Sequence, residues 1–344
     1  MKISMIGAGG WGIAMIAHLA HNNKDITLYC RNQETALALQ KNRESKKYLP
    51  GIFIPEHVHI TSNLKEATID KECIIISTPS SALEDTIKDL SIYLKKDAIV
   101  VCASKGLSYP DGGCLSDVIA KQLKGVTDNI VVLSGPNHAE EVGKGLPAAT
   151  VVASKKERAA HAVQDLYMSS NFRVYCSTDI IGVEYGGALK NIIAIASGVQ
   201  DGLGLGDNSR AALITRGLNE ITRFGVAFGA KSETFYGLSG IGDLIATCTS
   251  THSRNYNAGI KLANGMTKNQ ILAETSMVVE GFRTTEIVYS IAQKIGIDMP
   301  ITSSIPNKGS SLATASCKID GKSDSSASLS KVKPVNIAYC TSLL

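Results

Sequence analysis

The sequence lacks the features that would place it in a specialised class of protein. Aromatic residues make up only 5% of its 344 residues, and it contains a single tryptophan. Its net charge is only +4 and its basic residues are spread along the chain, so nothing indicates a nucleic-acid-binding surface. No apolar run reaches the roughly 20 residues that a membrane-spanning helix needs. The composition, 44% hydrophobic and 19% charged, is that of an ordinary globular protein with a sizeable core.

The eight cysteines bear on metal binding and on the cellular compartment. They form no CxxC pair and no cluster with histidine at metal-ligand spacing, so we expect no metal site. Cys73 and Cys102 stand in apolar, strand-like runs, where cysteine behaves as a small buried hydrophobe. This usage favours a reducing compartment. The N-terminus enters a strand-like run without a signal or transit segment, so we expect a cytoplasmic protein.

The first 179 residues alternate short β-branched runs with helical stretches. Candidate strands are residues 3–6, 26–30, 58–61, 73–77, 99–103, 130–133, 151–153 and 173–175, and candidate helices include 12–22, 81–94 and 115–123. Strands that are apolar on both faces and separated by helices predict a parallel sheet covered on both sides. We therefore expect residues 1–179 to form an α/β domain.

After residue 179 the β-rich runs stop. Helical periodicity covers residues 184–198, 209–224, 255–263 and 285–294, with glycine-rich interruptions at 201–208 and 238–243. A mostly α-helical second domain is expected over residues 180–302. Between Ser303 and Ser330, ten of the 28 residues are serine, and Pro306 would stop a helix. The tail, residues 303–344, is therefore expected to be disordered.

A glycine loop follows the first candidate strand. Gly7, Gly9 and Gly12 have GxGxxG spacing and precede a helical stretch. The first glycine permits a tight turn, the second lets the backbone approach a pyrophosphate, and the third lets helix and strand pack closely. Phosphates at such a loop bind the N–H groups of the helix N-terminus. The context predicts a dinucleotide-binding domain of the Rossmann type, and a purely structural turn is the alternative.

Arg31 stands at the end of the second candidate strand, where the ribose of a bound dinucleotide is expected. Sites that prefer NAD place an acidic residue about 20 positions after the loop. An arginine can instead hold a 2′-phosphate, so we predict that NADP(H) is accepted as well as NAD(H). A solvated arginine at a strand end is the alternative.

Three further strand ends are expected to open toward the cofactor, at residues 77–80, 103–106 and 133–139. Lys105 follows an apolar strand and precedes a glycine, a position suited to meeting an anion. Small residues and backbone amides at such strand ends commonly line a ligand crevice. Each stretch fits an ordinary loop equally well.

Lys190 lies in an otherwise apolar helical stretch, one turn after Gly186 and Gly187. Each helical glycine costs roughly 1 kcal/mol relative to alanine, which indicates close approach to another element. A lysine in this setting either snorkels to the surface or works in a pocket. In a ketone reductase, its ammonium can stabilise the forming alkoxide and supply the proton. We predict that Lys190 is the catalytic acid/base.

The segment from Asp243 to Asn257 carries a second signal. Ser253 is suited to cap a helix that starts at Arg254, and Asn255 follows directly. A helix N-terminus with these side chains is a ready anion site for a substrate phosphate. Asp243 is suited to accept a hydrogen bond from a substrate hydroxyl or to orient Lys190. Helix capping alone is the alternative for both.

Taken together, these motifs resemble the NAD(P)-dependent glycerol-3-phosphate dehydrogenase family. The resemblance rests on GAGGWG, ASKG, SGPNHAEE, GVEYGGALKNIIAIASG, LSGIGDLIATCTSTHSRN and VVEG, in order from residue 1 to about residue 302. It implies a Rossmann-type domain followed by a helical domain. It also implies reversible NAD(P)H-dependent reduction of dihydroxyacetone phosphate to sn-glycerol 3-phosphate, which feeds glycerophospholipid synthesis. The tail after MPIT departs from the family's pattern.

The resemblance also implies roles for individual residues. Lys190 would be the proton donor and acceptor, and Lys105 would contact both ligands. The implied cofactor contacts are Gly10, Trp11, Arg31, Ala139, Val278, Glu280 and Arg254. The implied substrate contacts are Gly135, Asn137, Asp243, Ser253, Arg254 and Asn255. Relatives usually carry a small hydroxyl residue at position 137, so Asn137 departs from the pattern.

Two alternatives to this function stay open on the sequence. One is another reductase built the same way, of the 3-hydroxyacid or ketopantoate type, in which the helix start at Arg254 would bind a carboxylate. The other is a dinucleotide-sensing module without turnover. In every case the expected partner is a small molecule, phosphorylated in the first reading, and a homodimer is the base-rate expectation for oligomeric state.

Overall fold

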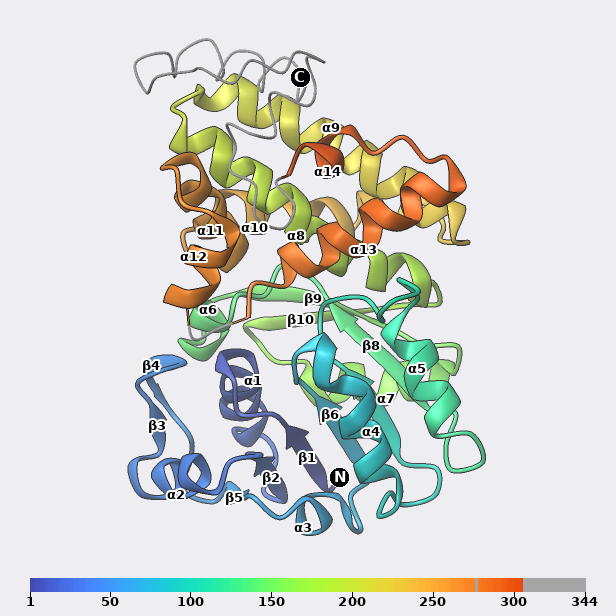
Figure 1. Cartoon of the computed structure of the whole chain (residues 1–344). Coiled ribbons are helices and arrows are strands. Elements are labelled where there is room, and N and C mark those ends of the chain that lie inside the picture. Colours follow the sequence, from blue (N-terminus) through green and yellow to red (C-terminus); the bar gives the residue numbers. More distant parts are fainter. Residues whose placement is uncertain (276–277, 306–344) are drawn as a thin grey trace. The chain divides into compact units, whose positions relative to one another are not determined.

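The computed structural model describes residues 1–275 and 278–305, which divide into two compact units (Figure 1). The N-terminal unit contains residues 1–108 and 113–184. The C-terminal unit contains residues 109–112 and the chain from Tyr185 onward. The chain therefore crosses between the units three times, after residues 108, 112 and 184.

An eight-stranded sheet forms the centre of the N-terminal unit. Its strands lie in the order β10-β9-β8-β7-β6-β1-β2-β5. Their bounds are β1 Ile3–Ile6, β2 Ile26–Tyr29, β5 His59–Thr61, β6 Cys73–Ile76, β7 Ile99–Cys102, β8 Ile130–Ser134, β9 Ala148–Ala153 and β10 Phe172–Ser177. The central strands β1 and β6 are buried along their whole length, as expected for apolar strands covered on both faces.

The expectation of a wholly parallel sheet is wrong at one place. β9 pairs antiparallel with β8, and β10 then pairs parallel with β9. The connection between β8 and β9 contains only the short helix α6, Ala139–Gly143, which packs against α1, Gly10–Ala20. Because α6 stays at the edge where β8 ends, the chain starts β9 from that same edge and must run back.

Helices cover the sheet on both faces. α4, Leu83–Ser91, packs with α5, Leu115–Gln122, while α1 packs with α6 and with α7, Glu157–Tyr167. The remaining elements of this unit are α2 Gln33–Asn42, α3 Leu64–Thr68, a 3₁₀ turn Ser80–Ala82, and a small antiparallel hairpin of β3 Glu44–Ser45 and β4 Leu49–Phe53. The sequence did not predict α2, α3, α6, α7 or the hairpin.

The C-terminal unit is helical, as the sequence predicts. Its elements are α8 Ile180–Gly202 (from Tyr185), α9 Gly206–Ala227, a 3₁₀ helix Ser232–Tyr236, a π-helical turn Leu238–Gly242, α10 Asp243–Thr249, α11 Arg254–Ala263, α12 Lys268–Glu274, α13 Glu280–Ile295 and α14 Pro300–Ser304. The glycine-rich stretch 238–243 is therefore helical rather than an interruption, because the π-helical turn runs directly into α10.

One described helix, α8, is long and apolar enough to cross a membrane on length and composition alone. The sequence did not single it out, because Glu184 and Lys190 interrupt its apolar run. Of its most apolar window, 94% is buried inside the protein. This is the burial pattern of a core helix.

The last described residues belong to the folded part of the chain. Ser303 and Ser304 lie in α14, and Ser304 and Ile305 are buried. The Glu220 carboxylate accepts hydrogen bonds from the backbone N–H groups of Ile301 and Thr302, at 2.9 and 2.8 Å. The helix thus extends past residue 302, where the sequence placed the start of the tail. The rest of the expected disordered tail, residues 306–344, lies outside the described residues.

Candidate active site

The glycine loop connects β1 to α1 with the geometry that its spacing predicts. Gly7 has φ +117°, a conformation that favours glycine. A Cβ on Gly12 would overlap the Gly7 carbonyl oxygen, whereas a Cβ on Gly9 would meet nothing within 4 Å. Gly9 is also the N-cap of α1, and no side chain caps that helix start. The loop therefore has open space in front of uncapped N–H groups, which fits a pyrophosphate.

Two further predicted cofactor residues flank this loop. Trp11 is half-buried, and within the described part of the chain its buried indole Nε1 has no hydrogen-bond partner. An indole N–H in this state is a donor that a bound ligand can satisfy. Arg31 is exposed just after β2, beside Asn32, which caps α2. The position of Arg31 fits a dinucleotide whose ribose lies at the end of β2.

The sequence did not predict that Tyr48 lies beside the loop. Its carbonyl oxygen lies 2.8 Å from where a Cβ on Gly10 would stand. Only a glycine at position 10 therefore lets the β3–β4 hairpin approach the start of α1. Nothing in the sequence around Tyr48 signals this contact, because it depends on the hairpin folding back onto α1.

Lys105 stands at the end of β7 and contacts the loop after β8. Its ammonium donates to the Gly135 carbonyl and to Asn137 Oδ1, both at 3.1 Å. Asn137 is buried, and its Nδ2 donates to Thr150 Oγ1 at 3.0 Å. Ala139 begins α6, which packs against α1. The structure thus gathers these predicted residues on the glycine-loop side of the sheet, and it adds Thr150.

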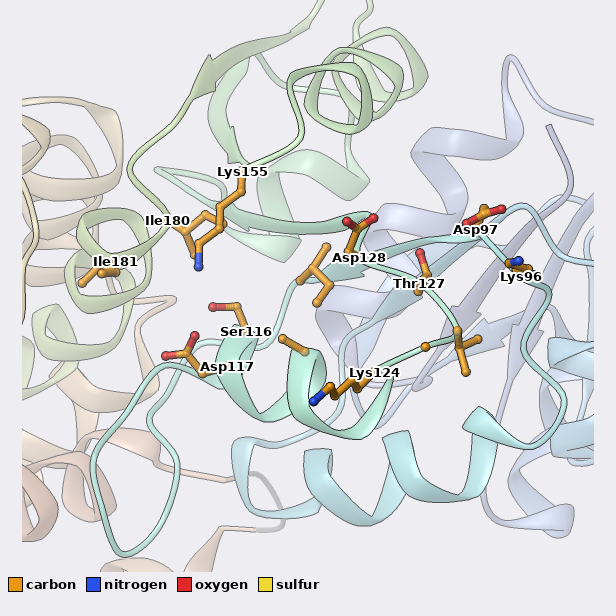
Figure 2. A pocket seen from close by; sticks show the side chains of 14 residues that line it. Lys96, Asp97, Ser116, Asp117, Lys124, Thr127, Asp128, Lys155, Ile180 and Ile181 are labelled. Carbon is orange, nitrogen blue, oxygen red and sulfur yellow. The ribbon is translucent and has the colours of Figure 1, made fainter.

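A cavity lies elsewhere in the N-terminal unit. Its volume is about 540 Å³, and Figure 2 shows Lys155, Ser116 and Asp117 around it. Its lining includes Asp97 and Asp128, which precede β7 and β8. The glycine loop follows β1, so the cavity lies at the opposite edge of the sheet from the loop. It is not the crevice that the glycine loop forms.

Lys190 is buried in the C-terminal unit, so the snorkelling alternative is wrong. Its side chain is 6% exposed and pairs with the Asp243 carboxylate, which is 2% exposed. The ammonium also donates to Thr247 Oγ1 at 2.8 Å. A Cβ on Gly186 would overlap the Ser239 carbonyl oxygen, which explains a glycine inside α8. That close approach brings the start of α10, with Asp243, against the lysine.

A second cluster surrounds the N-terminus of α11. Ser253 caps this helix, as predicted, and accepts a hydrogen bond from Tyr256 N at 3.2 Å. Asn255 Nδ2 donates to Asn191 Oδ1 at 2.8 Å, and Asn255 Oδ1 accepts from Gly281 N at 2.9 Å. This network ties α11 to α8 and to α13. Asn255 is buried within it.

Arg254 is exposed at the first position of α11 and donates to the Val278 carbonyl at 3.0 Å. Val278 is exposed, and Glu280 begins α13. The structure thus brings Arg254 and Val278 together. A guanidinium at a helix start is suited to binding an anion.

The predicted residues therefore fall into two groups, each in one unit. The N-terminal unit holds the glycine loop, Trp11, Arg31, Lys105, Gly135, Asn137 and Ala139, and the C-terminal unit holds Lys190, Asp243, Ser253, Arg254, Asn255, Val278 and Glu280. Thr247 was missed, although its spacing of four residues from Asp243 places both on one helix face. In residues 1–275 and 278–305, no group of three or more His, Cys, Asp or Glu side chains is arranged to hold a metal ion.

Comparison with known proteins assigns these two groups of residues to one family. Models of the N-terminus and C-terminus of NAD-dependent glycerol-3-phosphate dehydrogenase match residues 2–160 and 179–307. A glycerol-3-phosphate dehydrogenase [NAD(P)+] of Moorella thermoacetica is 49% identical over 304 residues, covering 88% of this chain and 90% of the relative. One of Fusobacterium nucleatum is 45% identical over 301 residues, covering 88% and 90%.

Solved structures show a likeness to the same family. A glycerol-3-phosphate dehydrogenase of Coxiella burnetii has a TM-score of 0.86 and 34% identity, covering 93% of this chain and 98% of that one. A ketopantoate reductase from Ralstonia eutropha has a TM-score of 0.57 and 14% identity, covering 88% and 95%, and so shares only the fold. The chain therefore belongs to the NAD-dependent glycerol-3-phosphate dehydrogenase family, and its cofactor is NAD(H) or NADP(H).

Proposed function

We propose that the chain catalyses the reversible, NAD(P)H-dependent reduction of dihydroxyacetone phosphate to sn-glycerol 3-phosphate, feeding glycerophospholipid synthesis. The observation that carries this proposal is the buried ammonium of Lys190, held by Asp243 and Thr247. A lysine costs free energy to bury and is rarely placed so without a role or a partner network. The family match and the identity to named relatives support the same substrate.

The reaction needs one proton at the substrate oxygen. A bound nicotinamide cofactor would supply or accept the hydride at the substrate C2. In reduction, Lys190 donates a proton to the carbonyl oxygen as that oxygen gains charge, and in oxidation it accepts the proton from the C2 hydroxyl. Asp243 and Thr247 fix the direction of the ammonium, so no reorganisation is needed when charge develops.

The substrate phosphate is assigned to the N-terminus of α11. Arg254 offers a guanidinium there, and the first turn of the helix offers backbone N–H groups. Ser253 and Asn255 hold the local geometry through their bonds to Tyr256 and Gly281. Fixing the phosphate this way orients the carbonyl for attack.

Arg31 supports use of NADP(H) at the cofactor site, since its guanidinium suits a 2′-phosphate. Arg31→Ala should raise the KM for NADPH relative to that for NADH, and equal changes in the two KM values would contradict the 2′-phosphate contact.

We also assign the protein to the cytoplasm. Five of the six described cysteines are buried and all six are free, which supports a reducing environment. A homodimer remains the base-rate proposal for its oligomeric state.

The test of the function is loss of reduced-nicotinamide absorbance with dihydroxyacetone phosphate, compared with ketopantoate and a 2-ketoacid. Oxidation with the phosphate alone is expected. Lys190→Met should lower kcat by about 10²- to 10⁴-fold while cofactor affinity, read from Trp11 fluorescence, changes little. The matched control is Lys268→Met, which removes another buried lysine of the same unit, paired with the partly exposed carboxylate of Glu286, and should leave kcat unchanged.

The alternatives give different results in the same assay. Equal losses of kcat and cofactor affinity in Lys190→Met would contradict its role as acid/base. Turnover of the ketoacids would indicate the rival reductase. Tight cofactor binding with no oxidation by any ketone would indicate a sensor. Asp243→Asn keeps the ammonium but weakens its alignment, so its kcat should fall less than that of Lys190→Met.

A further inference from the structure

The ammonium of Lys105 has two acceptors on the loop that follows β8. It donates to the Gly135 carbonyl and to Asn137 Oδ1, each at 3.1 Å. An ammonium has three donors, so these two contacts define most of its orientation. Lys105 is half-buried, whereas Asn137 is 6% exposed and lies behind it.

Both acceptors depend on a third residue, Thr150, on β9. Asn137 Nδ2 donates to Thr150 Oγ1 at 3.0 Å. The backbone at Gly135 also lies against this threonine, because a Cβ on Gly135 would stand 2.8 Å from Thr150 Cα and 3.1 Å from its Oγ1. Thr150 itself is 0% exposed. The two groups that hold Lys105 are thus fixed against one buried side chain.

The chemistry of the amide sets the direction of this chain of hydrogen bonds. Lysine only donates, so Asn137 must turn its oxygen toward Lys105 and its NH₂ toward Thr150. Thr150 is then an acceptor for a buried amide nitrogen. Removing that acceptor leaves the buried nitrogen without a hydrogen-bond partner. Rotation of the amide away from Lys105 then becomes favourable, because it lets the nitrogen find another partner.

We infer that Thr150 is a positioning residue for Lys105, acting through Asn137 and Gly135. It touches no substrate or cofactor in this role. Asn137 is then a support for Lys105 rather than a substrate contact in its own right. The inference rests on the proposed function and on the role that the family resemblance implies for Lys105, contact with both ligands.

The test compares Thr150→Val, Thr150→Ser and Lys105→Met by steady-state kinetics with dihydroxyacetone phosphate and NADPH. Thr150→Val keeps the volume and removes the acceptor, so it should raise the KM for dihydroxyacetone phosphate about tenfold. Thr150→Ser restores the acceptor and should return the KM to within about twofold of wild type. Adding Thr150→Val to Lys105→Met should cause no further loss.

A matched control separates positioning from general stability. Thr127 is similarly buried, and its Oγ1 donates to the Ala98 carbonyl at 2.8 Å. It lies at the opposite edge of the sheet, so Thr127→Val should lower the melting temperature without changing KM. If Thr150→Val does not fold, Thr150→Cys, a weak acceptor of similar size, should show the same KM defect.

The possible failures are distinguishable. If Lys105→Met leaves kinetics unchanged, the proposed role of Lys105 is wrong and nothing remains to be positioned. If Lys105→Met is impaired but folded Thr150→Val behaves like wild type, only the positioning role of Thr150 is wrong. Additive losses in the double variant, or no rescue by serine, would likewise overturn it, because a purely structural threonine would give additive effects.

Discussion

Glu184 should make the stability of the N-terminal unit fall as pH rises. It is 7% exposed and lies on α8, and it accepts hydrogen bonds from the backbone N–H (3.0 Å) and hydroxyl of Ser116. Ser116 is in the first turn of α5, whose N-cap Cys114 makes no side-chain cap. Glu184 therefore caps α5 from a distant part of the chain. Burial nevertheless raises the pKa of Glu184 to about 7, against the lowering effect of the Ser116 bonds.

The sign and size of the effect follow from that pKa. In the unfolded chain a glutamate pKa is about 4.5. Between pH 4.5 and 7 the folded protein holds a proton that the unfolded chain has released, so the free energy of unfolding falls with rising pH. Since one pKa unit corresponds to about 1.4 kcal/mol, the loss is roughly 3 kcal/mol above pH 7. Below pH 4.5 both the folded and the unfolded chain hold the proton, so the contribution of protonated Glu184 to the free energy of unfolding is fully present.

Glu184→Gln removes this titration while keeping an acceptor for Ser116 N. The free energy of unfolding of the variant minus that of wild type should therefore rise by roughly 3 kcal/mol from pH 5 to pH 8. Urea unfolding followed by the fluorescence of Trp11, which lies in the same unit, measures it. Parallel curves for the two proteins, within about 1 kcal/mol, would refute the reasoning.

Asp117→Asn provides the control for this prediction. The exposed carboxylate of Asp117 contributes to raising the pKa of Glu184, as the smallest of its causes. Its removal should lower that pKa and move the stability loss to slightly lower pH, without abolishing it. An unchanged pH dependence in Glu184→Gln together with a changed one in Asp117→Asn would refute the assignment of the stability loss to Glu184.

Two further predictions concern the C-terminal unit. Gly186→Ala should lower both kcat and stability, the latter by about 1–3 kcal/mol, because the methyl group would overlap Ser239 O and push α8 from α10. Gly113→Ala, whose methyl would meet nothing closer than 3.4 Å, is its control in melting and kinetic assays, and equal behaviour would contradict the packing role. Thr302→Val removes a hydroxyl donor to buried Glu220 and should cost about 1–3 kcal/mol in urea unfolding, whereas no loss would show that this hydrogen bond adds nothing to stability.

Local patterns predicted the parts of the fold that local chemistry determines. β1 at Ile3–Ile6 and the cap at Ser253 follow from apolar runs and from a side chain suited to a helix start. The conformation of the glycine loop likewise depends on residues close in sequence, and its spacing alone requires the turn at Gly7. These features need no knowledge of which segments meet in space.

The parts that escaped prediction depend on contacts between distant segments. Thr150 is an ordinary threonine in a strand, and only the loop after β8 folding onto β9 gives it a partner in Asn137. The antiparallel β9 depends on where α6 packs, which no periodicity reports. Asn191 was passed over because it follows Lys190 in an apolar helix, and its partner Asn255 is 64 residues away.

Two glycines of α8 lower the stability of that helix but allow the close packing that forms the site. A Cβ on Gly198 would overlap the Tyr256 carbonyl oxygen, as one on Gly186 would overlap that of Ser239. Each glycine lets a different element approach α8 closely, α11 near one end and the π-helical turn before α10 near the other. Between them stand Lys190, which meets α10 at Asp243, and Asn191, which meets α11 at Asn255. The destabilising glycines are therefore required where they are, since a helix with side chains at both positions could not bring Lys190 against α10 and Asn191 against the N-terminus of α11.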